Sequence, residues 1–163
     1  MASTDRDNYE QLSYGSAASM WTGQHLEVVA DAVATRTLTA KEAGALCLFD
    51  RAAGVVYTLP EPVIGMRFEF ACTVTVTSNA AKVITSAATE FLLGTIQVIG
   101  GTTESTASAD ANGSTHVAIS SNGSTTGGVI GGKFTVTAIS TTQWLIDGYI
   151  NGSGVVVTPF ATS

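Results

Sequence analysis

The sequence predicts an all-β protein, with a single antiparallel β-sandwich or jelly-roll-like domain over residues 31–163 and an extended N-terminal arm over residues 1–30. Three observations predict this class. Short apolar runs alternate with turn-forming segments along residues 35–85. Met66–Val76 alternates strictly between apolar and polar residues, and two further alternating runs near the C-terminus are joined by Ser-Thr-Thr. Short strands with frequent turns are typical of antiparallel sandwiches and barrels.

The arm is mainly polar and acidic, but it carries isolated large apolar side chains whose spacing fits neither a sustained helix nor a strand: Tyr9, Leu12, Tyr14, Met20 and Trp21. Tyr and Trp bury a large area while keeping a polar tip, so they are favoured at contacts between proteins. We therefore expect these five residues to be partner contacts, docking on the protein's own domain or on a neighbour. The alternative is that Trp21 merely packs on its own domain.

The domain begins with weaker signals. His25–Val33 fits a strand or a short helix, and we favour the strand. Thr39 can cap a single helical turn, which Gly44 can end. Ala45–Phe49 is an entirely apolar short run, as expected for a strand that is buried on both sides or that faces a core and a neighbour.

The next segment contains the clearest strand. Asp50–Gly54 carries turn residues and is predicted to reverse the chain, so that Val55–Leu59 returns antiparallel. Met66–Val76 then alternates over about ten residues, which places one face on the core and the other in a wetter environment. Arg67 and Glu69 lie on the wetter face and are expected to form a solvated surface pair.

The second half mixes strands with low-complexity segments. Ala87–Ile99 is rich in large apolar residues and predicts one or two strands broken near Gly94. Gly100–Ser114 and Ser120–Gly132 consist mainly of small residues that bury little side chain, and they predict loops.

The last hairpin is well marked. Lys133–Ile139 and Gln143–Ile150 both alternate, and Ser140, Thr141 and Thr142 provide the turn between them. Trp144 is most simply a core residue of this hairpin.

Composition limits the function classes. Only 12% of the 163 residues are charged, and the formal net charge is -6. An acidic chain without a basic stripe is repelled by phosphate, so we expect no nucleic-acid partner. The apolar runs are far shorter than a membrane span, and the N-terminus lacks the pattern of a signal peptide, so we expect no membrane partner. The weakly charged surface fits burial against neighbouring subunits or, equally, a Thr-rich sandwich.

The chemistry-bearing residues form no recognisable site. Cys47 and Cys72 each lie in a predicted strand and are expected to be buried small hydrophobes, although a disulfide between adjacent strands stays possible. His25 and His116 complete no metal-ligand spacing, so no metal or cofactor is expected. Neither histidine has a recognisable nucleophile partner and no GxSxG motif is present, so we expect no catalytic residues and no enzyme. A hydrolase stays an alternative that requires two carboxylates facing one cleft.

Three segments together resemble small structural proteins of tailed bacteriophages, and capsid decoration (cement) proteins in particular. They are TLTAKEAGALCLFDRAAGVVYTLPEPVIGMRFEF, TSNAAKVIT and ISTTQWLIDGYINGSG. The similar features are the LTA…G turn, D-x-A-A-G leading into TLP-x-P, the G-x-x-F-x-F strand, TSN, and the late TQW hairpin. They cover roughly residues 35–153, and the arm is not part of the pattern.

The resemblance implies a β-sandwich or jelly-roll protein, commonly a homotrimer, that is made in the host cytoplasm and sits on the outer surface of the virion capsid. It implies that the partner is the major capsid protein and that each copy bridges capsomers and stabilises the shell. Similar modules occur in other virion appendages. The alternative function is therefore a receptor- or glycan-binding module of a phage tail or head fibre, whose Gly/Ser loops and exposed aromatics contact host sugars.

Overall fold

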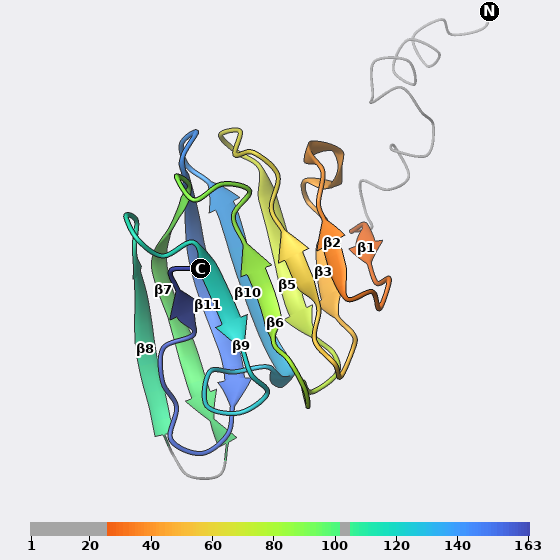
Figure 1. Cartoon of the computed structure of the whole chain (residues 1–163), viewed down its shortest axis with the longest axis vertical. Coiled ribbons are helices and arrows are strands. Elements are labelled where there is room, and N and C mark those ends of the chain that lie inside the picture. Colours follow the sequence, from red (N-terminus) through yellow and green to blue (C-terminus); the bar gives the residue numbers. More distant parts are fainter. Residues whose placement is uncertain (1–25, 102–104) are drawn as a thin grey trace, which may run out of the picture.

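The computed structural model describes residues 26–101 and 105–163, and this part of the chain is almost entirely β (Figure 1). The all-β prediction is confirmed. One sheet, here called sheet A, has seven strands in the order β1 (Val28–Val29), β3 (Leu46–Phe49), β5 (Arg67–Cys72), β10 (Val129–Ala138), β11 (Gln143–Gly152), β7 (Phe91–Gly100) and β8 (Ser105–Asn112). The other, sheet B, has five strands in the order β12 (Phe160–Ala161), β9 (Ala118–Ser121), β6 (Ala81–Ile84), β4 (Val56–Thr58) and β2 (Thr35–Thr37).

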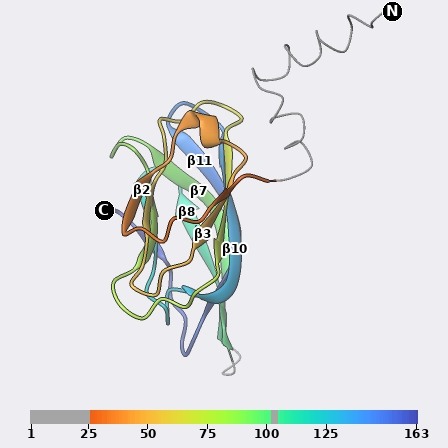
Figure 2. The same cartoon turned by 90° about the vertical axis from the view of Figure 1, so that its right-hand side faces the viewer.

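The two sheets lie face to face and bury one hydrophobic core between them (Figure 2). Tyr57 of sheet B packs against Phe49 and Phe70 of sheet A, with ring centroids 5.5 and 5.6 Å away. Its hydroxyl donates a 2.8 Å hydrogen bond to the carbonyl oxygen of Leu48 in β3. Aromatic packing and a polar bond therefore join the two layers at the same side chain.

The strand pairing differs from the antiparallel prediction, because both sheets are mixed. Five strand pairs are parallel, β1–β3, β3–β5, β2–β4, β4–β6 and β7–β11, and five are antiparallel. From β1 to β7 the chain changes sheet at every strand. Each crossing reverses the chain direction, so the second crossing restores it, and the next strand in the same sheet runs parallel to the last (Figure 1). Asp50–Gly54 therefore carries the chain from sheet A to sheet B and does not close a hairpin.

Several local predictions are confirmed. Thr39 begins a single helical turn, η1 (Ala40–Glu42), and both its backbone N–H and its hydroxyl donate to the Glu42 carboxylate. Gly44 follows with φ +98, a conformation that favours glycine. The late hairpin is formed by β10 and β11, in which Trp144 is fully buried.

The low-complexity segments were predicted as loops. This is wrong for residues 105–112 and 129–132, which belong to β8 and β10, and for residues 100 and 120–121, which end β7 and β9. Gly94 does not break a strand either, since β7 runs continuously through it. Ala107, Ala109 and Ala111 of β8 alternate with polar residues, and the latter two alanines are buried. The sequence of β8 therefore alternates with period two. Its apolar residues are all alanine, the smallest apolar side chain, so the composition of the strand resembles that of a loop.

Residues 26–30 complete the predicted arm, and part of this segment joins the fold. Val28–Val29 forms β1 and pairs in parallel with Leu46 and Cys47 of β3. The strand favoured over residues 25–33 is thus two residues long, and the described chain enters sheet A at its β1 edge.

Candidate functional site

The five arm residues predicted to contact a partner lie outside the described residues: Tyr9, Leu12, Tyr14, Met20 and Trp21. Their role stays a prediction. The site that the structure does describe is the outer face of sheet A, which turns away from sheet B (Figure 2).

The outer face of sheet A is built by the alternation of its strands. Inward side chains such as Phe68, Ile96 and Ile146 are fully buried, so their neighbours along each strand point outward. The central outward residues are Arg67 and Glu69 on β5, Lys133, Thr135 and Thr137 on β10, Leu145, Asp147 and Tyr149 on β11, Thr95 and Gln97 on β7, and Thr106, Ser108 and Asp110 on β8. Six of these thirteen residues carry a hydroxyl group and five are charged.

The charges on this face are divided between its two sides. On β5 and β10, Glu69 accepts from Arg67 at 2.9 Å and from Lys133 at 2.7 Å. The hydrogen bond from Lys133 is the main reason that the pKa of the Glu69 carboxyl lies below its ordinary value. On the other side, Asp147 and Asp110 flank Thr95 in register, and the Thr95 hydroxyl donates to Asp110 at 2.7 Å. The predicted surface pair of Arg67 and Glu69 is confirmed as part of a three-residue ion network.

Tyr149 lies in the middle of the outer face and is 43% exposed. In register it has Lys133 of β10 on one side and Gln97 of β7 on the other. Its ring thus has a side chain that can form hydrogen bonds on each side. The sequence contained the signal for this residue, because Trp144, Ile146 and Ile150 mark the alternate positions of β11 that face the core, and Tyr149 falls between them.

Exposed apolar side chains gather where β10 ends and β11 begins. This end patch consists of Val63, Ile64, Ile139 and Leu145, which are 40% to 69% exposed. The turn holding Val63 and Ile64 is attached to β10 because Gly65 N–H donates to the Ala138 carbonyl oxygen at 2.9 Å. The end patch continues the outer face of sheet A and adds apolar area to a mainly polar surface.

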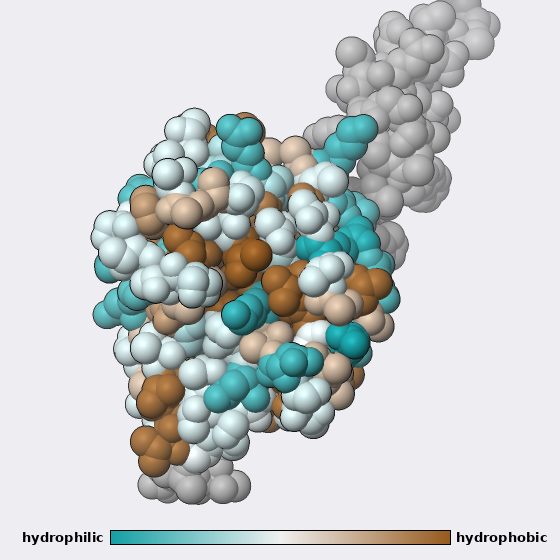
Figure 3. Space-filling view, in the orientation of Figure 1, coloured by the Kyte–Doolittle hydropathy of each residue, from teal (hydrophilic) through white to brown (hydrophobic). Residues whose placement is uncertain are grey.

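The opposite side of the molecule, formed by sheet B, alternates apolar and polar surface (Figure 3). Val56 and Lys82 are neighbours in register on adjacent strands there, and Thr58 and Ile84 form the next pair. All four are half-buried.

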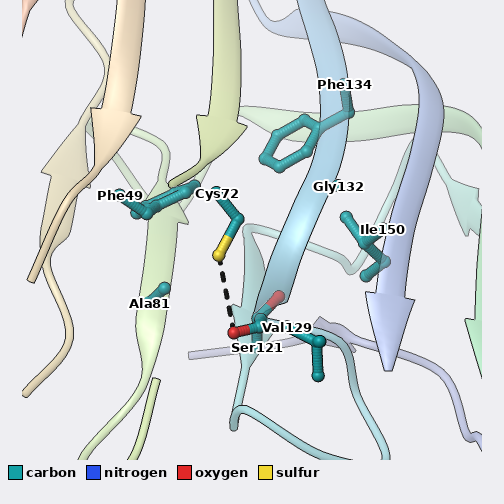
Figure 4. Close-up of a pocket in the computed structure, with 9 residues that line it drawn as sticks. Phe49, Cys72, Ala81, Ser121, Val129, Gly132, Phe134 and Ile150 are labelled. Carbon is teal, nitrogen blue, oxygen red and sulfur yellow. Dashed lines mark hydrogen bonds between the residues drawn. The ribbon is translucent and has the colours of Figure 1, made fainter. Parts of the chain in front are cut away.

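A small recess opens between the two sheets beside Cys72 (Figure 4). Its walls come from both sheets and include Phe49, Ala81, Ser121, Phe134 and Ile150. Its volume is about 10 Å³, which is room for about one water molecule. The Cys72 thiol donates weakly to the carbonyl oxygens of Val74 and Gly128, at 3.3 and 3.5 Å. A substrate or cofactor does not fit in this recess.

The remaining chemistry-bearing groups are structural. Cys47 and Cys72 are both free and buried, which confirms the expectation of buried small hydrophobes and shows no disulfide between them. His116 stacks on Phe160 at 5.5 Å, and its Nδ1 accepts from the Asn112 backbone N–H. Within residues 26–101 and 105–163, no three His, Cys, Asp or Glu side chains are grouped to hold a metal ion. No helix in this part of the chain has the length and apolarity to cross a membrane.

Comparison with known proteins finds no matching family model, no matching curated protein and no matching solved structure.

Proposed function

We propose that this protein is a virion structural protein, a capsid decoration (cement) protein that binds the outer face of a phage head and bridges capsomers. The proposal takes its two facing sheets as a sandwich or jelly-roll-like domain. The partners are the major capsid protein and other copies of this chain, with a homotrimer expected. Its place is the outer surface of the capsid, after synthesis in the host cytoplasm. The resemblance of residues 35–153 to such proteins motivates the proposal.

The observation that carries the proposal is the outer face of sheet A. It is broad and rich in Thr, its charges of both signs nearly cancel, and it continues into the apolar end patch of Val63, Ile64, Ile139 and Leu145. Five strands of sheet A supply this face, and no other described segment forms a layer over it (Figure 2). A surface of this composition suits a subunit that remains bound to a capsid shell.

The proposed mechanism is additive burial. Each copy ties two or three shell subunits together through modest contacts, and because the contacts of one copy are linked, they act at a high effective concentration. The many copies on one head then resist expansion by packaged DNA without any single strong bond. No catalytic group is required for this role.

The test uses expanded phage heads and the purified full-length protein. Co-sedimentation and a higher temperature of thermal rupture support the proposal, and absence of both contradicts it. Leu145→Asp, which places a charge on the outer face of sheet A, is expected to weaken head binding at least about tenfold, since it buries an unpaired charge. Val155→Asp is the matched control, because Val155 is 76% exposed and lies outside sheet A, after the end of β11. Deleting residues 1–24 separately tests the arm: we expect a folded domain that no longer binds heads.

The second candidate is a receptor- or glycan-binding module, and Tyr149 is the observation that favours it. A sugar ring can stack on an exposed tyrosine while flanking Lys133 and Gln97 hydrogen-bond its hydroxyls. Labelling of intact particles separates the two candidates, since copies over the whole head support the decoration protein and copies at a fibre or tail tip support the glycan-binding module.

A further inference from the structure

The four sheet edges of the described fold are unequal. Sheet A ends at β1 and β8, and sheet B ends at β12 and β2. Strands β1 and β12 have two residues each, and β2 has three. Arg36 in the middle of β2 also forms ion pairs with Asp31 and Glu42. Short strands and charged edges of this kind discourage pairing with another chain.

Strand β8 lacks these protections. It is eight residues long, contains no proline or lysine, and has Asp110 as its one charged residue. It pairs with β7 on one side and, among residues 26–101 and 105–163, has no strand paired on the other (Figure 1). An edge of this length presents a row of backbone donors and acceptors that a second strand can satisfy.

The hydrogen-bond phase of the β7–β8 ladder shows which groups face outward. Gly113 N–H donates to the Leu92 carbonyl oxygen at 2.8 Å, so the hydrogen-bonded residues of β8 are the alternate ones, Ala107, Ala109 and Ala111. The backbone N–H and C=O groups of Thr106, Ser108 and Asp110 therefore point away from β7. The side chains of these three residues are also exposed, on the outer face of sheet A.

We propose that β8 pairs antiparallel with β8 of a second copy across a two-fold axis at Ser108, which joins the two seven-stranded sheets into one continuous sheet. The pairing places Ser108 opposite Ser108 of the partner subunit and Thr106 opposite Asp110 of the partner subunit. The backbone groups that point outward then exchange about six hydrogen bonds across the axis.

The single charge of β8 favours this register over one centred on Asp110. Thr95 already donates to Asp110 from the β7 side, and in the pair Thr106 takes the equivalent place on the other side. The two Asp110 carboxylates are then four residues apart along the strands, about 13 Å, which exceeds the screening length of about 8 Å at physiological salt. A two-fold axis at Asp110 would instead place these like charges directly opposite, which destabilises a strand pair.

The β8–β8 contact goes beyond the proposed function, because the oligomer that it forms is not the trimer expected there. A two-fold contact alone gives a dimer, and combined with a three-fold contact it gives a hexamer. Sedimentation equilibrium of the full-length protein is therefore expected to show twice the mass of the assembly that remains when the β8 contact is removed. Ser108→Lys places two ammonium groups together on the axis and is expected to halve the mass, as is Ser108→Asp.

Mixing the two variants provides the decisive arm of the experiment, because a Lys and an Asp at the axis attract each other. The mixture is expected to recover the wild-type mass. Thr137→Lys is the matched control: it adds the same charge to the same face on β10, three strands inside the edge, and is expected to leave the mass unchanged. Circular dichroism checks that every variant is folded.

Disulfide trapping tests the register. Ser108→Cys is expected to form a disulfide-linked dimer, because hydrogen-bonded antiparallel partners have Cα atoms about 5.5 Å apart. Thr106→Cys is expected not to do so, since the two positions are four residues apart. If the wild-type protein has the mass of one or three chains and Ser108→Lys leaves that mass unchanged, the proposed edge pairing is wrong. The decoration role is not affected by that result. Edge pairing without head binding overturns the decoration role alone.

Discussion

Gly94 of β7 lies directly against the backbone of Ile146 in β11, where a Cβ atom on Gly94 would stand 2.2 Å from the Ile146 carbonyl oxygen. The two residues are partners in the parallel β7–β11 pair, in which β7 is the strand next to the β8 edge of sheet A. Gly94 also has φ +125, a conformation that side chains rarely adopt. The glycine that resembles a strand breaker in the sequence therefore permits the close approach of two strands.

Gly94→Ala is expected to lower the free energy of unfolding by about 3 kcal/mol or more, because backbone strain adds to a collision with backbone. Gly44→Ala is the control, since Gly44 has φ +98 but nothing within 4 Å of the added Cβ, and its cost should be about 1–2 kcal/mol. Chemical denaturation measures both values. Equal losses would show that the contact with Ile146 carries no energy.

Tyr57→Phe removes the hydrogen bond from sheet B to the Leu48 carbonyl oxygen without emptying the core. The expected loss is about 1 kcal/mol in the free energy of unfolding, the usual net value of such a bond. Tyr149→Phe makes the same change on an exposed side chain and is expected to cost under about 0.5 kcal/mol. If Tyr57→Phe left the free energy of unfolding unchanged, the hydrogen bond would not contribute to holding the two sheets together.

The ion network at Glu69 predicts a pH-dependent contribution to stability. The pKa of Glu69 is lowered in the folded state, first by the hydrogen bond from Lys133, so the contribution is present above the ordinary value of 4.5 and is lost as the pH falls through the lowered value. Lys133→Met should therefore cost up to about 1 kcal/mol at pH 7 and much less at pH 3.

Unfolding curves across this pH range check the expectation for Glu69. Lys82→Met is the control, since Lys82 makes no ion pair with the described residues. A Lys133→Met penalty that stays constant from pH 7 to pH 3 would contradict the role of the Glu69 carboxylate.

Both thiols are expected to be inert in the folded protein. Burial raises the pKa of Cys47 to about 12 and also raises the pKa of Cys72, so little thiolate exists at neutral pH. A thiol reagent at pH 7 should react with both cysteines far more slowly in the folded protein than after unfolding. Within the folded protein, Cys72 should react before Cys47, because it lines the recess and is 8% exposed. Rapid reaction of Cys47 in the native protein would contradict its burial.

The sequence predicted burial correctly wherever the alternation within a single strand shows which of its side chains face the core. The alternation of Met66–Val76 predicted that Phe68 and Phe70 are buried and that Arg67 and Glu69 are not. The same reasoning predicted the β10–β11 hairpin, because two alternating runs with a three-residue turn leave few other arrangements. It did not detect β8, where alanine marks the buried face.

The sequence alone determined that the chain is β, where most of its strands lie, and which of their side chains face the core. Tertiary structure decided the strand partners. A short turn such as Asp50–Gly54 serves equally well to close a hairpin or to cross to a facing sheet, and the choice depends on which strands bury their apolar faces together. That choice made five pairs parallel, and it also placed β8 at an open edge and assembled the outer face of sheet A from β5, β10, β11, β7 and β8.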